Sequence, residues 1–305
     1  MRQQATLRTT VSIDGVGLHS GHPVRAHFHP APIDHGLVFL RREHSDQLIP
    51  AELDSAATFD YATTLKRGDV SIGTVEHVLA AAAGLGLDNC LIEIEGPEVP
   101  ILDGSALPFV RLFHAAGFER QDALVRPLSL DRPVELLRDG KRMSFEPGGP
   151  GLTIRYEIDF PHPFVGQQEL TYTLRPEEFA SRIAPARTFG FLEEVETLRK
   201  SGLVRGGSLE NAIVLSRDGV LNPEGLRFPD EFCRHKILDL IGDLSLLGHP
   251  LIGHIVAERA GHAMHYALVS KLLKERDAWK LVANPQKDHE AARLPLAELA
   301  ANPTA

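Results

Sequence analysis

The chain has 305 residues, 43% hydrophobic and 24% charged, which is the composition of a soluble globular protein long enough for two domains. Its net charge of −9, without a basic region, argues against a nucleic-acid partner. Residues 1–10 lack the apolar core of a signal peptide, no apolar run is long enough to cross a bilayer, and two cysteines, Cys90 and Cys233, fit a reducing compartment. We therefore expect a cytoplasmic protein without stable membrane insertion.

The first part of the chain predicts short strands followed by a buried helix. Alternating patterns predict strands at 6–13, 24–29, 36–42 and 47–53. Residues 72–87 predict a helix that Thr74 caps and Gly84 ends, with Glu76-His77 as its one polar pair. A strand at 89–95 and a helix at 106–116 follow, and residues 119–130 have the irregular pattern of a linker.

The second part repeats this order. Strands are predicted at 131–138, 141–146, 151–159, 168–174 and 211–216, and a last one at 251–258. Residues 228–251 predict a buried helix and residues 262–276 an amphipathic one. We therefore interpret the chain as two similar α+β domains, residues 1–125 and 126–283, whose buried helices meet. Residues 284–305 turn polar and then Ala/Pro-rich, which predicts a mobile tail.

The helix predicted at 228–251 is apolar almost all round but carries one polar stripe. His235, Asp239 and Asp243 recur at every fourth position, so they lie on one face. Buried carboxylates are costly unless they are paired or bind a metal. Either Arg234, Lys236 or a distant histidine satisfies the two aspartates, or His235 and Asp239 ligate a metal ion.

A catalytic zinc ion normally takes three protein ligands, so the second interpretation needs a third one. His77 is the only other histidine on a strongly predicted buried helix, and Glu76 beside it could act as a base. His262 follows Ala260-Gly261 at a strand–helix junction, where histidines usually cap the helix or face solvent. Asp243 could hold the His262 imidazole and raise its pKa.

Several segments in the same order resemble one enzyme family. They are GVGLHSG (15–21), TVEHVLAAAAGLGLDN (74–89), ILDGSALPFV (101–110), ARTFGF (186–191), GLRFPDEFCRHKILDLIGDLSLLGHPLIG (225–253) and AGHAMH (260–265). Over residues 5–283 the chain is similar to the zinc-dependent UDP-3-O-acyl-N-acetylglucosamine deacetylases of lipid A synthesis. The resemblance implies two α+β domains, each a sheet on two helices, with the helices sandwiched between the sheets.

The resemblance also implies a set of catalytic roles. His77, His235 and Asp239 would hold one Zn²⁺ ion, and Glu76 would take the proton of the attacking water. The Thr188 hydroxyl would stabilise the oxyanion, and His262, steadied by Asp243, would protonate the leaving amine. The enzyme would be a hydrolase acting on a linear amide, the N-acetyl group of a UDP-activated acylated amino sugar, in the committed step of lipid A synthesis. A monomer is expected.

Further residues are implied as substrate contacts. Lys236 would meet the diphosphate, Phe160 would stack on uridine, and either Lys141 or Arg142 would contact the nucleotide. The loop at 15–23 contributes His19. The acyl chain would lie in an apolar passage of a βαβ insert at about 187–213, lined by Phe189, Phe191, Leu192, Val195 and Leu198. Alternatively, these side chains only pack the insert against its own sheet.

Two other classes of function remain open. The chain could be a metal amidohydrolase of the same fold that acts on another N-acetyl compound. It could also be a non-catalytic protein in which the His/Asp stripe is a structural zinc site or an ion-pair network. A structural zinc site is normally closed by four protein ligands, usually with cysteine, whereas here the fourth candidate is an acid–base residue, Glu76. The pattern therefore favours catalysis.

Overall fold

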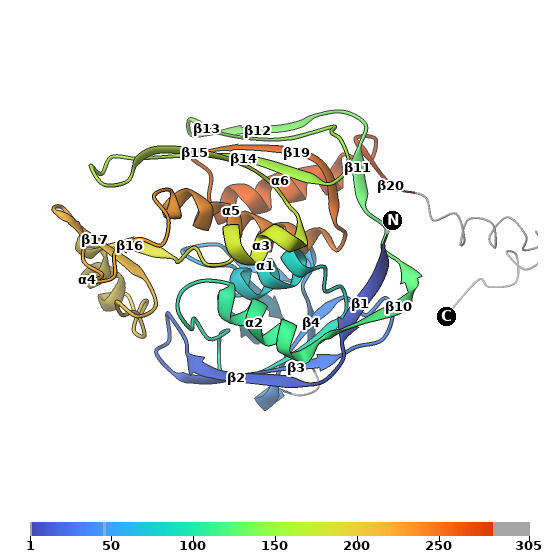
Figure 1. The fold of residues 1–305 in the computed structure, drawn as a ribbon, viewed down its shortest axis with the longest axis horizontal. Coiled ribbons are helices and arrows are strands. Elements are labelled where there is room, and N and C mark those ends of the chain that lie inside the picture. Colours follow the sequence, from blue (N-terminus) through green and yellow to red (C-terminus); the bar gives the residue numbers. More distant parts are fainter. Residues whose placement is uncertain (1, 45–46, 283–305) are drawn as a thin grey trace, which may run out of the picture.

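Two β-sheets form outer layers of the structure, with helices between them (Figure 1). The computed structural model describes residues 2–44 and 47–282. The strands of the first sheet are, in spatial order, β2 (Val11–Val16), β3 (Pro23–Pro30), β9 (Cys90–Glu95), β4 (Leu37–Arg41) and β5 (Leu48–Pro50). The second sheet contains β12 (Val134–Arg138), β13 (Lys141–Glu146), β19 (Leu251–Glu258), β14 (Leu152–Phe160) and β15 (Gly166–Thr173). At one end of β19 this sheet continues through β11 (Leu128–Leu130) to β20 (Trp279–Leu281).

The two sheets have the same topology. In the first, β9 pairs antiparallel with β3 and parallel with β4. In the second, β19 pairs antiparallel with β13 and parallel with β14. Each central strand is preceded by a buried helix and followed by another helix: α1 (Glu76–Leu85) and α2 (Leu107–Ala116) in the first half, α5 (Glu231–Leu244) and α6 (His262–Lys274) in the second. The predicted α+β class with a duplicated sheet-and-two-helix unit is confirmed.

The two buried helices touch each other at the centre of the molecule. Neither helix has a single apolar stripe, because both are covered on nearly all sides, and α5 buries twelve of its fourteen residues. Gly242 of α5 lies against the backbone of Glu76 in α1, where a Cβ atom would come within 2.1 Å of the Glu76 carbonyl oxygen. Only glycine lets the two helix backbones approach so closely.

Each half carries an insert between its fourth strand and its buried helix. In the first half it includes a small sheet of β6 (Ala56–Thr58), β7 (Thr64–Arg67) and β8 (Val70–Ile72). In the second half, α3 (Pro176–Arg182) precedes β16 (Phe189–Phe191), α4 (Leu192–Lys200), β17 (Ile213–Ser216) and β18 (Gly219–Val220). Strands β16 and β17 are parallel and α4 connects them, so this is a βαβ unit, and it projects at one side of the molecule (Figure 1).

Several predicted boundaries were wrong. Thr74 does not cap α1: it has a left-handed backbone (φ 56°), and its hydroxyl donates to Glu98 Oε2 at 2.9 Å. The helix does not end at Gly84, which is a residue within α1 that packs against the Phe179 ring. It ends at Leu85, and Gly86 (φ 70°) is the C-cap. The predicted strand 6–13 is two strands, because residues 8–10 separate β1 (Gln3–Leu7) from β2.

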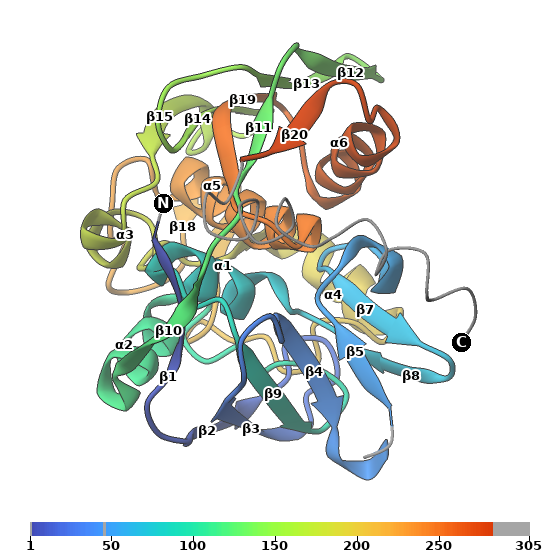
Figure 2. The same ribbon diagram turned by 90° about the vertical axis from the view of Figure 1, so that its right-hand side faces the viewer.

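The predicted linker at 119–130 is also wrong, because most of it is paired. Strand β10 (Phe118–Leu124) pairs with β1, and β11 joins the second sheet through β19 and β20. The chain crosses from the first layer to the second through β10 and β11 (Figure 2). The division of the chain at residues 125 and 126 stays a prediction, and the predicted tail at 284–305 lies outside the described residues. Within residues 2–44 and 47–282, every helix is too short or too polar to span a lipid bilayer.

The glycine contact between α1 and α5 can be tested by adding one methyl group. In an open helix position, Gly→Ala gains about 1 kcal/mol of helix propensity. At Gly242 the added Cβ atom would overlap backbone rather than a movable side chain, so we expect Gly242→Ala to lower the free energy of unfolding by about 1–3 kcal/mol. Urea unfolding measures this change. Gly149→Ala is the control, since a Cβ atom there meets nothing within 4 Å, and equal stability of both variants would refute the close crossing.

Candidate functional site

The contact between α1 and α5 brings the predicted metal ligands together. His77 Nε2 lies 3.7 Å from Asp239 Oδ1, and His235 Nε2 lies 3.3 Å from the same oxygen. One donor atom from each of the three residues lies within 4.8 Å of the other two, and all three residues are buried. The helical spacing places His235 and Asp239 one turn apart, and the crossing of the helices supplies His77.

The distances and the open donor atoms fit a metal ion. Two donors on one tetrahedral zinc ion lie about 3.3 Å apart, given bonds of about 2.0–2.1 Å. The separations at Asp239 Oδ1 are close to this value. That oxygen is buried and accepts no hydrogen bond in the described part of the chain, a costly state for a carboxylate unless a cation occupies the position. The residues present therefore fit a zinc ion held by His77, His235 and Asp239.

Neighbouring groups orient two of these ligands. His235 Nδ1 lies 3.1 Å from the carbonyl oxygen of Ala186, so Nδ1–H donates there and Nε2 keeps a lone pair toward Asp239. Burial lowers the pKa of His235 to about 3, although the attraction of Asp239 opposes this shift. The low pKa keeps the imidazole ring neutral, as a metal ligand must be. The Lys236 ammonium donates to Asp239 Oδ2 at 2.7 Å. At Asp239 the ion-pair interpretation is thus correct for Oδ2 but not for Oδ1, which accepts no hydrogen bond in the described part of the chain.

The ARTFG segment that contains Ala186 is fixed on the start of α5. Arg187 is buried and pairs with the fully buried Glu231 at 2.9 Å and with Glu224 at 2.6 Å. Thr188 donates its N–H to Gly104 of the DGS turn, and its carbonyl accepts from Ile213 at the start of β17. Thr188 is therefore held beside the α5 helix between the first half and the insert.

Asp243 organises a second cluster next to the first. Its Oδ2 lies 2.7 Å from Nδ1 of both His262 and His265, and its Oδ1 accepts the Thr63 hydroxyl at 2.6 Å. Separations of 2.7 Å are hydrogen-bond distances, shorter than the spacing of two donors on one metal ion. This cluster is therefore a hydrogen-bonded network, and the predicted contact between Asp243 and His262 is confirmed.

Charge compensation decides the pKa values in this network. Burial disfavours the imidazolium form of His262, but the Asp243 carboxylate favours it, and the balance raises the pKa of His262 to about 9. Burial likewise opposes the charged form of Asp243, but attraction to His262 and hydrogen bonds from both histidines lower its pKa to about 2. His262 is therefore a cation at neutral pH beside an ionised Asp243.

Glu76 lies between the two clusters. It is almost fully buried, and its Oε2 accepts the backbone N–H of Thr63 at 3.0 Å. Burial raises the pKa of Glu76, and the charges of His262 and His77 partly oppose this shift. A buried carboxyl group whose pKa moves toward neutrality, next to a metal site, has the properties of a general base.

The predicted aromatic contacts lie together at the base of the insert. The Phe160 ring centroid is 5.6 Å from that of Phe189 and 5.8 Å from that of Phe191. Phe189 also lies 6.4 Å from the His235 ring and 5.7 Å from the Lys236 ammonium. The residues assigned separately to uridine and to the acyl chain therefore form one apolar cluster next to the metal site.

Other predicted substrate contacts lie farther out. On α4, Val195 and Leu198 are half-buried and Leu192 is exposed. His19 lies in the loop before β3, and neither nitrogen of its ring has a hydrogen-bond partner in the described part of the chain, although both are buried. Arg142 is paired with Glu135 and Glu258. Lys141 is exposed at the start of β13.

Sequence analysis missed four participants in the site. Thr63 contacts both Glu76 and Asp243, and Tyr156 reaches the network through His265. Glu98 accepts hydrogen bonds from the His19–Ser20 backbone and from Thr74, which ties the loop before β3 to the start of α1. Only His265 had a visible signal, since it lies three residues beyond His262 on the same helix.

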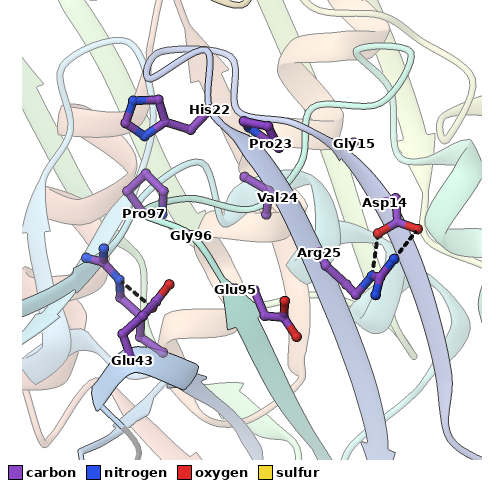
Figure 3. A pocket seen from close by; sticks show the side chains of 11 residues that line it. Asp14, Gly15, His22, Pro23, Val24, Arg25, Glu43, Glu95, Gly96 and Pro97 are labelled. Carbon is purple, nitrogen blue, oxygen red and sulfur yellow. Dashed lines mark hydrogen bonds and ion pairs between the residues drawn. The ribbon is translucent and has the colours of Figure 1, made fainter.

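Two pockets lie away from the residues predicted to bind the metal ion and to transfer protons. One, of about 520 Å³, is on the first sheet and is lined in part by His22, Glu43 and Glu95 (Figure 3). Asp14 and Arg25 pair across neighbouring strands there. The other, of about 640 Å³, lies between the halves near the C-terminal ends of α1 and α5. Neither is lined by a predicted catalytic or metal-binding residue.

Comparison with known proteins agrees with this geometry. Residues 4–274 match the family model LpxC, described as UDP-3-O-acyl N-acetylglycosamine deacetylase. The chain is 45% identical over 298 residues to the UDP-3-O-acyl-N-acetylglucosamine deacetylase of Myxococcus xanthus (strain DK1622), covering 97% of this chain and 95% of that protein. A protein of the same name from Anaeromyxobacter sp. (strain Fw109-5) is 45% identical, and the match covers 96% of this chain and 96% of that protein. Another, from Anaeromyxobacter dehalogenans (strain 2CP-C), is 46% identical, and the match covers 92% of this chain and 90% of that protein. The chain therefore belongs to the LpxC family of UDP-3-O-acyl-N-acetylglucosamine deacetylases.

Proposed function

We propose that this protein is a zinc-dependent hydrolase that removes the acetyl group from UDP-3-O-(3-hydroxyacyl)-N-acetylglucosamine, which yields acetate and the free 2-amine for lipid A synthesis. The observation that carries the proposal is the buried cluster of His77, His235 and Asp239, with Glu76 and His262 beside it. Membership of a deacetylase family across nearly the whole chain supports the substrate.

In the proposed reaction, water adds to the acetamide carbonyl carbon and the carbon–nitrogen bond breaks. A zinc ion bound by the three ligands would supply a Lewis acid and lower the pKa of a coordinated water. Glu76 accepts the proton from the attacking water. The Thr188 hydroxyl donates to the oxyanion. His262 donates a proton to the departing nitrogen, and Asp243 keeps His262 in its cationic form until that step.

Side chains near the proposed metal site and in the loop before β3 support the proposed substrate contacts. The aromatic cluster of Phe160, Phe189 and Phe191 offers apolar surface to the uridine and to the acyl chain. Lys236 would meet the diphosphate as a point charge. The unpartnered His19 ring supports a hydrogen bond to the substrate, since its buried nitrogens otherwise lack partners in the described part of the chain.

A structural zinc site is a weaker alternative. It would normally use four protein ligands, often cysteines. Cys90 and Cys233 are both buried, and the Cys233 thiol donates to the backbone oxygen of Tyr156. Three ligands from His and Asp, with an acid–base pair next to them, favour catalysis.

Metal content and acetate release test the function together. The purified protein should contain about one zinc ion, release acetate from the UDP-linked substrate, lose activity to a chelator and recover with zinc. Asp239→Ala should lower zinc affinity at least about 100-fold, because loss of even an outer partner typically costs about 10- to 100-fold. Asp230→Asn, at the N-cap of the same helix and paired with Arg234, is the control. Full zinc content in Asp239→Ala would remove Asp239 from the ligand set.

The pH dependence of kcat/KM tests the acid assignment. The raised pKa of His262 means that its cation is present at neutral pH and is lost as the pH rises through about 9, so activity should fall there. Asp243→Asn removes the main attraction for that cation, and the alkaline limb should move down by about 1–3 pH units. An alkaline limb that stays in place in Asp243→Asn would show that another group controls it.

The acyl passage can be tested by a bulky substitution in α4. If Val195 and Leu198 line an apolar passage, Leu198→Trp should raise KM for a long-chain substrate by about 10-fold, the cost of losing burial of roughly two methylene groups. A short-chain analogue should be affected much less. Thr197→Trp, at an exposed position of α4 beside Leu198, is the control. Equal losses for both chain lengths would instead support simple packing of the insert.

A further inference from the structure

Helix α6 carries a second histidine one turn beyond His262. His265 is 1% exposed, its Nδ1 lies 2.7 Å from Asp243 Oδ2, and its Nε2 lies 3.1 Å from the Tyr156 hydroxyl. Tyr156 is fully buried on β14, in the sheet of the second half. The chain Tyr156–His265–Asp243 therefore runs from the sheet, through α6, to the carboxylate on α5 that holds His262.

The direction of each hydrogen bond in this chain follows from the donors available. An ionised Asp243 only accepts, so the Nδ1–H groups of His262 and His265 both donate to Oδ2, and the Thr63 hydroxyl donates to Oδ1. A neutral His265 protonated at Nδ1 has its lone pair on Nε2, which accepts from the Tyr156 hydroxyl. Burial lowers the pKa of His265 and raises that of Tyr156, which agrees with both groups being neutral.

Three donors from two parts of the fold thus fix the two oxygens of Asp243. Thr63 approaches from the first half, while His262 and His265 approach from α6. Without His265, Oδ2 would accept from His262 alone, and rotation of the carboxylate would move the His262 ring with it. Among the described residues, the His265 ring contacts Asp243, Tyr156 and the edge of the His262 ring, whose centroid is 5.9 Å away, so any effect of His265 on catalysis passes through the Asp243–His262 pair.

We propose that His265 and Tyr156 are positioning residues, which hold the Asp243 carboxylate and thereby keep the His262 imidazole aimed at the leaving nitrogen. The inference rests on the proposed roles of His262 and Asp243. A network that only stabilised the fold would contribute to the free energy of unfolding and leave kcat unchanged at temperatures where the protein is folded. Loss of a positioning residue, by contrast, lowers kcat while zinc content and KM stay the same.

Substitutions at His265 separate these cases. His265→Leu removes the donor to Asp243, and kcat should fall about 10- to 100-fold, the usual effect of losing a partner that orients a catalytic group. His265→Asn restores an N–H donor near the position of Nδ1, so most of kcat should return. Tyr156→Phe removes only the outer hydrogen bond and should have a smaller effect in the same direction. Zinc content and the urea midpoint of each variant are measured alongside, and Tyr156→Phe keeps the test available if His265→Leu does not fold.

The decisive comparison is a double-mutant cycle. If His265 acts through His262, His265→Leu should cause no further loss of kcat in a His262→Ala background. A full additional loss in that background, or a His265→Leu enzyme with wild-type kcat, would overturn the positioning role. The proposed function fails separately: a fully active His262→Ala enzyme would remove His262 as the acid, whatever His265 does.

Discussion

The burial of three carboxylates between two crossing helices is the constraint on which this structure depends. Glu76, Asp239 and Asp243 are at most 3% exposed. Each buried ion costs several kcal/mol unless neighbouring groups compensate it. Asp243 accepts three hydrogen bonds, and Glu76 accepts one from a backbone N–H. One oxygen of Asp239 accepts from Lys236, whereas its second oxygen has no hydrogen-bond donor in the described part of the chain and faces two histidines. A cation at that oxygen would complete the compensation, which would link the candidate metal site directly to the packing of α1 against α5.

Duplication of the fold supplies the two helices, but the halves contribute different chemistry. In the proposed mechanism, the first half would provide one ligand and the base from adjacent positions on α1. The second half would provide two ligands from α5 and the proton donor from α6. The equivalent helix of the first half, α2, begins with Leu107-Pro108 after the DGS turn and contributes none of the assigned groups. The site therefore exists only where the halves meet, and Gly242 sets how closely they do so.

Sequence patterns predicted the parts of this site that local geometry determines. The four-residue spacing of His235, Asp239 and Asp243 requires a common face if α5 is helical, and its apolar surroundings require burial. The search for a third ligand on another buried helix then indicated His77, with Glu76 beside it as a base, and the family resemblance implied the same roles. Thr63 and Tyr156 had no such signal, because they contact Asp243 and His265 across 180 and 109 residues of sequence. The predicted start of α1 was wrong for the same reason: Thr74 is a good capping residue, but its hydroxyl donates to Glu98 instead. Strand β10 has no clear alternation of buried and exposed residues, so it was mistaken for a linker.

The proposed mechanism requires one catalytic zinc ion held by His77, His235 and Asp239, with a position left open for water and substrate. X-ray absorption spectroscopy of the zinc-loaded protein can test this ligand set. We expect nitrogen and oxygen donors at about 2.0–2.2 Å, with two imidazoles among them. A sulfur donor at about 2.3 Å would instead place the ion at Cys90 or Cys233 and contradict the assignment. A closed shell of three or four imidazoles would contradict it as well.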